Sequence, residues 1–294
     1  MPRIATNAIE LHYESFGAAS APSVLLIMGL GAPLTRWNDD LCDLLVERGF
    51  RVVRFDNRDC GLSTRCADLP LPDIAAALRG EPLTALPYTL ETMAADSLGL
   101  LDALNIEQAH LVGASMGAAI AQIIAARNPQ RTLSLTSIMS SSGNPLLPPP
   151  TPVAAMALFA PLPLARDRAS IVADAIARYL PIASPGYPTA LADLQRMFGD
   201  EYDRGYYPPG VARQLGAVIA DGDRRPLLRR ITCPVVVLHG RNDPLILPAH
   251  AEDVARNIAK AQLRLIDGMG HDFPAALNMT FADAICAAAN QHRY

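Results

Sequence analysis

The sequence has no run of basic residues longer than a pair, no long apolar segment and no signal-peptide pattern near its start. With a formal net charge of −4, the chain offers no positive patch for nucleic acid or anionic lipid. No apolar segment approaches the roughly 18 residues that cross a bilayer. Residues 1–17 alternate polar and apolar side chains instead of placing an apolar run after a basic start. We therefore expect a soluble, cytoplasmic protein that binds no nucleic acid and inserts into no membrane.

A pattern of paired cysteines is also missing. The five cysteines are odd in number and scattered, with no C-x-x-C or other metal-ligand spacing; they are Cys42, Cys60, Cys66, Cys233 and Cys286. This distribution predicts reduced, mostly buried thiols and gives no indication of a metal site.

Short strand-like and longer helix-like segments alternate along the 294-residue chain, of which 50% is hydrophobic. Runs rich in β-branched residues or Leu predict strands at residues 23–28, 51–55, 109–114, 132–139, 234–240 and 262–267. Segments of helical periodicity lie between them, at residues 37–47, 90–104, 115–127, 248–259 and 273–291. Because parallel neighbours need crossover connections, this alternation predicts an α/β fold with a mostly parallel sheet covered by helices on both faces.

The alternation stops between residues 143 and 225. This region opens with "NPLLPPPTP", is rich in Pro, Ala and Leu, and predicts several short helices with no strand among them. Proline cannot continue a helix interior, so residues 148–150 indicate a boundary. We therefore divide the chain into a first core segment (residues 1–142), a helical cap (143–225) and a second core segment (226–294).

One serine stands between two glycines, in "GASMG" at residues 113–117, directly after an expected strand and directly before an Ala-rich helix. The pattern is G-x-S-x-G, in which a sharp strand-to-helix turn strains the backbone at the serine and leaves room only for small residues beside it. Gly113 and Gly117 fit that requirement. The turn also lifts the hydroxyl to the positive end of the following helix. We expect Ser115 to be a nucleophile.

A serine hydroxyl needs a base to take its proton, and the base needs an orienting acid. His271 follows the last expected strand, on the Gly-rich loop "DGMGHDFP", at the edge where strand ends converge. The other five histidines are better explained as structural residues; they are His12, His110, His239, His250 and His292. We expect His271 to act first as general base and then as general acid.

The orienting acid is expected at the same edge of the sheet. Asp243, in "HGRNDP", comes just after the next-to-last strand. The alternative position, after the strand at residues 132–139, reads "SSSGN" and offers no carboxylate. Asp96 and Asp102 lie in an expected helix, where a solvated helix face explains them. Asp243 is therefore the expected acid.

An oxyanion hole needs two donors, and both are expected to be backbone amides. The first is the N–H of Met116, the residue after the nucleophile. The second comes from the loop "MGLGAP" after the first parallel strand, where Gly29 and Gly31 let the backbone turn its amides toward the site. Leu30 is the expected donor, with a neighbouring amide as the alternative. Each donor of this kind accounts for about 10²–10³ in turnover.

Together these segments resemble the α/β-hydrolase superfamily. "GASMG" is similar to its nucleophile elbow, "FDNRDCGLST" to its D-x-R-G-x-G-x-S element, "LHGRNDPLI" to its acid turn and "GMGH" to its base loop. The chain order of serine, aspartate and histidine is also that of this fold. More narrowly, "IMGLG" combined with "RFDNRDCGLST" resembles the aclacinomycin methylesterase type of carboxylesterase. The resemblance covers residues 23–140 and about 227–289, and implies that the helical insertion is the cap of that family.

The sequence departs from the family pattern at two positions. Met28 replaces the histidine that usually begins the oxyanion loop, so only the backbone donors remain. Asp59 stands where glycine is usual in the D-x-R-G element, so its turn must accommodate a side chain. We interpret Asp56 and Arg58 as structural residues that hold this loop by hydrogen bonds behind the site, with substrate contact as the minor alternative.

The resemblance and the three expected residues imply acyl transfer to water through an acyl-enzyme, with a small-molecule ester as substrate and no metal or organic cofactor. The expected substrate-binding residues are Met28, Gly29, Gly31 and Trp37, the alternative being that they only pack the cap onto the core. An apolar stretch at residues 153–165 predicts a neutral, hydrophobic substrate, by analogy a methyl ester of a bulky acid.

Three alternatives remain from the sequence. The same residues serve lactonases, thioesterases, perhydrolases and acyltransferases. The fold also supplies receptors that bind a ligand without turning it over. Finally, the cap could serve mainly as a contact with a second copy, in a homo-oligomer, or with a lipid surface.

Overall fold

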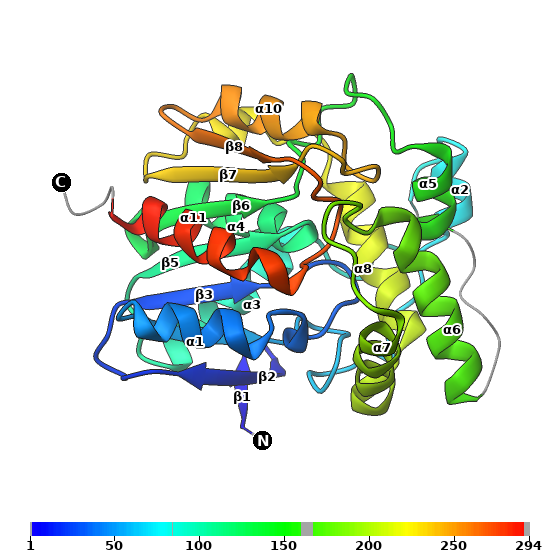
Figure 1. Ribbon diagram of the computed structural model, residues 1–294, viewed down its shortest axis with the longest axis horizontal. Coiled ribbons are helices and arrows are strands. Elements are labelled where there is room, and N and C mark those ends of the chain that lie inside the picture. The colour runs from blue at the N-terminus through cyan, green and yellow to red at the C-terminus, as the bar shows by residue number, and fades with distance from the viewer. Residues whose placement is uncertain (1, 84, 160–166, 291–294) are drawn as a thin grey trace.

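An eight-stranded sheet forms the centre of the molecule, in the order β1-β2-β4-β3-β5-β6-β7-β8 (Figure 1). The computed structural model describes residues 2–83, 85–159 and 167–290. The strands are β1 (Arg3–Thr6), β2 (Ile9–Phe16), β3 (Ser23–Ile27), β4 (Arg51–Phe55), β5 (Ala109–Ala114), β6 (Thr132–Ile138), β7 (Val235–Gly240) and β8 (Gln262–Ile266). Strand β2 pairs antiparallel with both β1 and β4, and the other pairs are parallel. The prediction of a mostly parallel sheet is confirmed, whereas β1 and β2 were not predicted as strands.

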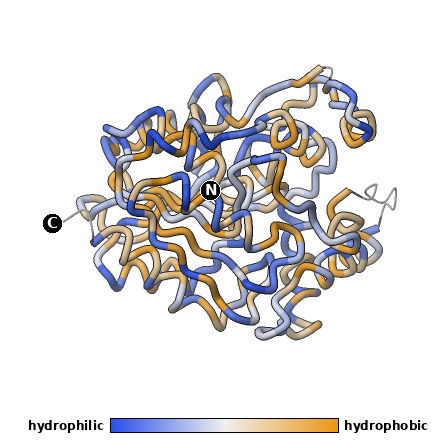
Figure 2. Tube along the Cα trace, turned by 90° about the horizontal axis from the view of Figure 1, so that it is seen from above, coloured by the Kyte–Doolittle hydropathy of each residue, from blue (hydrophilic) through white to orange (hydrophobic). Residues whose placement is uncertain are grey.

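Helices cover both faces of this sheet, as predicted. One face carries α1 (Asp39–Glu47) and α11 (Asn278–Asn290), and the other carries α3 (Leu90–Ala103), α4 (Met116–Arg127) and α10 (Pro248–Asn257) (Figure 1). Successive residues of β3 alternate between the two buried layers, because neighbouring side chains of a strand point to opposite faces. Figure 2 shows the largely apolar strands running through the interior.

The first and last of these helices begin later than the sequence predicts, for local reasons. The side chain of Asn38 accepts the N–H of Leu41, so α1 starts after this cap, at Asp39. Residues Ala275–Leu277 form a separate 3₁₀ turn, η4, before α11 begins at Asn278. The other 3₁₀ turns are η1 (Leu34–Arg36), η2 (Pro129–Arg131) and η3 (Leu180–Ile182).

The segment between β6 and β7 packs beyond the carboxyl ends of the parallel strands (Figure 1). Its described helices are α5 (Pro152–Phe159), α6 (Arg168–Tyr179), α7 (Leu191–Gly205), α8 (Pro208–Asp221) and α9 (Arg225–Leu228), and its described residues contain no strand. Buried side chains of α6 and α7 form a small core of their own; they are Val172, Ile176, Tyr179, Leu194 and Phe198. Helix α2 (Ile74–Leu78), from the first part of the chain, contacts α8.

The sheet order fixes where a site can form. From β3 the chain continues to β4 on one side, whereas β5 lies on the other side of β3. Loops leaving β3 and β5 therefore diverge and open a crevice at their carboxyl ends, the usual position of a ligand site in such sheets. Helices α5 to α8 lie over this crevice.

Two further expectations concern the cysteines and the membrane. All five cysteines are free, but only Cys42 and Cys60 are buried, so the prediction of mostly buried thiols is wrong for the other three. Among the described helices, none has the length and apolar character that crossing a bilayer requires.

Candidate active site

Ser115 occupies a strained turn between β5 and α4. Its backbone lies at φ 54° and ψ −118°, outside the regions that a side chain favours. A Cβ on Gly113 would come within 2.3 Å of the Gly117 carbonyl oxygen, and one on Gly117 within 2.0 Å of the Ile27 carbonyl oxygen. Only glycine fits at either position, so the two glycines that flank the serine follow from the close packing of β3, β5 and α4.

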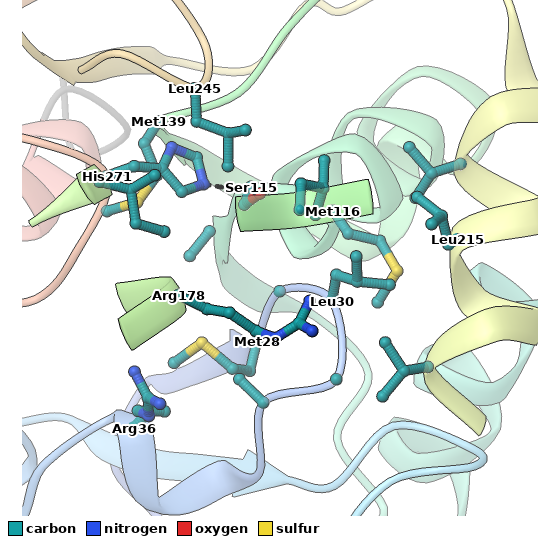
Figure 3. Close-up of a pocket in the computed structure, with 18 of the residues that line it drawn as sticks. Met28, Leu30, Arg36, Ser115, Met116, Met139, Arg178, Leu215, Leu245 and His271 are labelled. Carbon is teal, nitrogen blue, oxygen red and sulfur yellow. Dashed lines mark hydrogen bonds between the residues drawn. The ribbon is translucent and has the colours of Figure 1, made fainter. Parts of the chain in front are cut away.

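The three side chains that the sequence singled out come together in the structure. Ser115 Oγ lies 3.1 Å from His271 Nε2 (Figure 3). On its other side, His271 Nδ1 lies 2.7 Å from Asp243 Oδ2. Ser115 follows β5, Asp243 follows β7 and His271 follows β8. Strand ends far apart in the sequence thus bring a hydroxyl, an imidazole and a carboxylate into one hydrogen-bonded line.

The Asp243 carboxylate is buried and hydrogen-bonded through both of its oxygens. Its Oδ1 accepts the N–H groups of Leu245 (2.9 Å) and Ile246 (2.8 Å), while Oδ2 faces His271. Burial opposes ionisation of this carboxyl, but the adjacent His271 imidazole and the His239 ring hold its pKa below the usual value. An ionised carboxylate only accepts hydrogen bonds, so Nδ1 of His271 carries a proton and Nε2 is left to accept the proton of Ser115.

The loop that carries His271 is held by the segment after α6. The N–H of His271 donates to the Ile182 carbonyl (2.7 Å), and the N–H of Gly270 donates to Ser184 Oγ (2.8 Å). The next residue, Asp272, is buried and accepts hydrogen bonds from Ser184 Oγ and from the Tyr179 hydroxyl, the latter at 2.7 Å. The position of the imidazole therefore depends on residues of the helical insertion as well as on the sheet.

Sequence reasoning missed this role of Asp272. The available signal was an acidic residue directly after the expected base, in "GHDF". Its partners lie about 90 residues earlier in the chain, with no spacing pattern that connects them.

The sequence predicted the backbone N–H groups of Met116 and Leu30 as oxyanion-hole donors. Met116 is the first residue of α4, and within the described part of the chain no group accepts the N–H of Met116 or of Leu30. The N–H of Gly31 donates to Gln214 Oε1 at 2.8 Å, which excludes it, whereas the N–H groups of Leu30 and of the neighbouring Gly29 have no acceptor among the described residues. A Cβ on Gly29 would lie 3.2 Å from the Ser115 Cβ, so the loop passes directly beside the nucleophile.

A cavity of about 620 Å³ opens above Ser115, between the sheet edge and the helices of the insertion (Figure 3). Met28, Leu30, Met116 and His271 are among the residues that line it, together with Gly29 and Gly31. This volume lies in the range of small-molecule sites.

Trp37 does not line this cavity. Its side chain is completely buried and packs against Phe273, with ring centroids 4.8 Å apart. The prediction that Trp37 contacts substrate is therefore wrong, because the residue belongs to the layer between the sheet and helices α1 and α11.

The cavity also contains more charge than the sequence suggested. Arg178 and Asp174 of α6 form an ion pair at 2.6 Å, and Arg36 pairs with Glu201 of α7 (Nη2 to Oε2, 3.0 Å). Figure 3 labels Arg36, Arg178 and Met28 among the residues that line the cavity. Because each guanidinium has a carboxylate partner, these two pairs add no net charge to a largely apolar wall.

The "DNRDC" segment supports the site from behind, as interpreted from the sequence. Asp56 accepts the N–H groups of Leu34 (2.8 Å) and Leu62 (2.9 Å) and pairs with Arg204 of α7 at 2.9 Å. Arg58 binds Asp96 through two hydrogen bonds, of 2.6 and 2.7 Å. The interpretation of Asp96 as a solvated helix residue is therefore wrong.

Asp59, where the family has glycine, adopts the left-handed conformation that glycine favours, with φ 63°. Its carboxylate compensates for that strain by accepting the Cys66 N–H (2.7 Å) and the Tyr88 hydroxyl (2.9 Å). It also faces Arg213 of α8 at 3.4 Å, so the unusual residue links the core to the insertion.

The remaining histidines contact other groups. His12 is buried in β2, His110 contacts Ser134 Oγ (2.9 Å), and His239 Nε2 donates to the Ile246 carbonyl (2.7 Å) on the turn that carries Asp243. His250 contacts Ser141 Oγ and lines the cavity. His292 lies outside the described residues.

Comparison with known proteins agrees with this geometry. The model of the alpha/beta hydrolase fold family matches residues 22–274. The chain is 28% identical to rhodomycin D methylesterase DnrP of Streptomyces peucetius, covering 97% of this chain and 96% of that protein. It is 27% identical to DauP, the rhodomycin D methylesterase of Streptomyces sp. (strain C5), with the same coverage. The solved enol-lactonase of Burkholderia xenovorans LB400 has a TM-score of 0.73 at 25% identity, covering 98% of this chain and 100% of that chain. On these grounds the chain belongs to the alpha/beta hydrolase fold family.

Proposed function

We propose that the chain is a serine carboxylic-ester hydrolase that acts on hydrophobic small-molecule esters. The observation that carries this proposal is the hydrogen-bonded line from Ser115 Oγ through His271 to Asp243, which ends in a cavity of about 620 Å³. A serine with such a base and a buried orienting carboxylate is suited to nucleophilic attack on an ester carbonyl.

In the proposed reaction Ser115 attacks the ester carbonyl while His271 takes its proton through Nε2. His271 then gives this proton to the leaving alcohol, and an acyl-enzyme forms. A water molecule, deprotonated by the same imidazole, attacks the acyl carbon and releases the acid and the serine. The N–H groups of Met116 and Leu30 stabilise the negative oxygen of both tetrahedral intermediates, because each has an unused donor beside the nucleophile.

Residues 143–225 act in this proposal as a cap that encloses the substrate. The floor of the cavity is formed by Met28, Gly29, Gly31 and Met116, and the roof includes apolar residues of α5, α6 and α8. These walls favour an ester with a bulky apolar part. The names of the two methylesterases suggest a methyl ester of a bulky acid as the first substrate class to test.

Lactone hydrolysis is the second candidate. It is favoured by the likeness to the solved enol-lactonase, whose whole length is covered by this chain. A lactone is an internal ester, so the same attack by Ser115 opens the ring and the leaving alcohol stays attached to the acyl group.

The test is a panel of p-nitrophenyl esters of increasing acyl length, methyl esters and lactones, assayed with the wild type and with Ser115→Ala. We expect turnover by the wild type to fall about 10⁴-fold or more in the variant, since the residual rate comes only from binding and the oxyanion donors. A fluorophosphonate should label the wild type and leave S115A unlabelled. Ester turnover that persists in S115A would overturn the proposal.

A further inference from the structure

A second serine–histidine pair lines the same cavity. Ser141 Oγ lies 2.8 Å from His250 Nδ1. Ser141 follows β6 and is the neighbour of Ser140, whose hydroxyl donates to the Ser115 carbonyl oxygen at 2.9 Å. His250 lies in the first turn of α10. The pair is therefore close to the nucleophile along the sheet edge, but it has no part in the proposed triad.

The hydrogen bonds of His250 determine the direction of this contact. Its Nε2 lies 2.9 Å from the carbonyl oxygen of Pro148, and a carbonyl can only accept. Nε2 therefore carries a proton. In the neutral imidazole Nδ1 is then the acceptor, so the hydroxyl of Ser141 must donate to it.

This arrangement leaves one hydrogen-bonding position on Ser141. A hydroxyl has one proton and two lone pairs. The proton is used by His250, and one lone pair accepts the N–H of Gly143 at 2.9 Å. No donor among the described residues reaches the second lone pair of Ser141, a half-buried residue that lines the cavity. Beside a neutral His250, Ser141 therefore offers an acceptor to a ligand and not a donor.

The surroundings of Ser141 select an uncharged donor. The guanidinium of Arg224 lines the cavity and donates to the backbone carbonyl of Ser141, but it is paired with the carboxylate of Asp221, so the pair adds no net charge to this wall. Leu147 and Leu245 belong to the apolar part of the same lining, which favours a neutral group on an otherwise apolar ligand.

We propose that Ser141, oriented by His250, is a subsite that accepts a hydrogen bond from a neutral hydroxyl group carried by the substrate at some distance from its ester. This inference deepens the proposed esterase function and rests on it. The preferred substrate is thus an apolar ester with one free hydroxyl, rather than a simple hydrocarbon ester.

The test uses p-nitrophenyl alkanoates that carry a hydroxyl at successive carbons of the acyl chain, each paired with its unsubstituted ester. For each pair, kcat/KM of the hydroxylated ester is divided by kcat/KM of the unsubstituted ester. This ratio is measured in the wild type, in Ser141→Ala and in Ser141→Thr. At one hydroxyl position we expect the ratio to fall about three- to tenfold in S141A, the size of one neutral hydrogen bond, and to be kept in S141T.

Ser142→Ala is the matched control. Ser142 stabilises the same segment, through Asp253 and the Asn144 N–H, but it does not line the cavity. If Ser141 only stabilised its segment, S141A and S142A would lower the kcat/KM ratio by the same factor. An equal fall of the ratio in both variants would therefore overturn the subsite. An unchanged ratio in S141A at every hydroxyl position would do the same.

A binding measurement separates this proposal from the proposed function. The Kd values of the same ester pairs are measured by calorimetry with S115A and with the S115A/S141A double variant. If no ester is hydrolysed by the wild type, the esterase proposal fails. The subsite is still supported when the hydroxyl lowers the Kd for S115A and this gain is lost in the double variant. It is overturned when the hydroxyl does not lower the Kd for S115A, or when the gain persists in the double variant.

Discussion

The two oxygens of Asp243 have separate functions. Oδ1 accepts two backbone N–H groups, of Leu245 and Ile246, which fixes the orientation of the carboxylate on its turn. Oδ2 is thereby aimed at His271 Nδ1. The turn after β7 therefore does more than place a negative charge near the base, because it also selects the tautomer of the imidazole.

Asp243→Asn should separate orientation from charge. The backbone donors require the amide oxygen at the Oδ1 position, so the amide nitrogen must face His271 and donate to Nδ1. The imidazole would then carry its proton on Nε2 and could not take the proton of Ser115. We expect kcat for an aryl ester to fall about 10⁴-fold with the protein still folded.

The control for this variant is Asp102→Asn. Asp102 pairs with Arg131 on the surface, and its side chain is 64% exposed. We expect its activity to match the wild type. Activity of D243N within about tenfold of the wild type would show that the carboxylate has no part in orienting the base.

At the scale of elements, the base loop is a joint product of the sheet and the insertion. Strand β8 brings the chain to the sheet edge, but residues 182–184 provide the acceptors for the His271 N–H and the Gly270 N–H. A Cβ on Gly270 would lie 2.5 Å from the Ile182 carbonyl oxygen, so the two segments are in direct contact. A movement of the insertion would therefore displace the imidazole.

Tyr179→Phe tests this coupling. Burial and the nearby Asp272 raise the pKa of the Tyr179 hydroxyl, so it stays protonated and donates to Asp272 throughout the working pH range. The variant removes this one donor and keeps the ring that packs against Phe198. We expect kcat to fall about three- to tenfold with KM nearly unchanged, and fluorophosphonate labelling of Ser115 to slow by a similar factor.

Tyr13→Phe provides the comparison, since Tyr13 lies on β2 and does not line the cavity. Equal kinetics in both variants, with a lower Tm for Y179F alone, would indicate that the Tyr179 bond only stabilises the fold. A change in KM without a change in kcat would point instead to substrate contact.

At the scale of the whole molecule, the sequence predicted the elements whose signal is local. Strands β3 to β7 are almost entirely buried, because both faces of the sheet are covered, and β3 and β7 contain continuous apolar runs. The triad candidates followed from their positions just after such strands. Strand β2 was not predicted, because it alternates polar and apolar residues and pairs antiparallel with β4. It therefore lacks the strand–helix alternation that indicated the parallel strands.

The errors arose where a role depends on a distant partner. Trp37 follows the oxyanion loop closely in sequence. The local sequence does not show whether such a residue lines the cavity or is buried in the apolar layer beneath it. Asp96 has the spacing of a solvated helix residue, but Arg58 lies 38 residues away and binds it in the interior. The contact of Asp272 with Tyr179 has a separation of 93 residues and gives no local signal.

Buried histidines make the stability of the whole fold depend on pH. Burial lowers the pKa of His12, with a further contribution from Arg204, and burial also lowers the pKa of His239. Both remain uncharged in the native state at a pH where they are protonated in the unfolded chain, so the unfolded state binds more protons. The free energy of unfolding should therefore be insensitive to these groups above pH of about 6.5 and should fall as the pH drops below it.

His12→Gln tests the contribution of one group. Both ring nitrogens of His12 are buried without a hydrogen-bond partner among the described residues, and no residue of the cavity is involved. Each such histidine contributes a slope of up to about 1.4 kcal/mol per pH unit, so urea unfolding between pH of about 8 and 5 should give a flatter profile for H12Q than for the wild type. The slope is the readout, because the amide also changes stability by an amount that does not vary with pH. Parallel profiles for the two proteins would mean that His12 takes up its proton equally in the folded and unfolded chains, and that its buried position in β2 tolerates the charge.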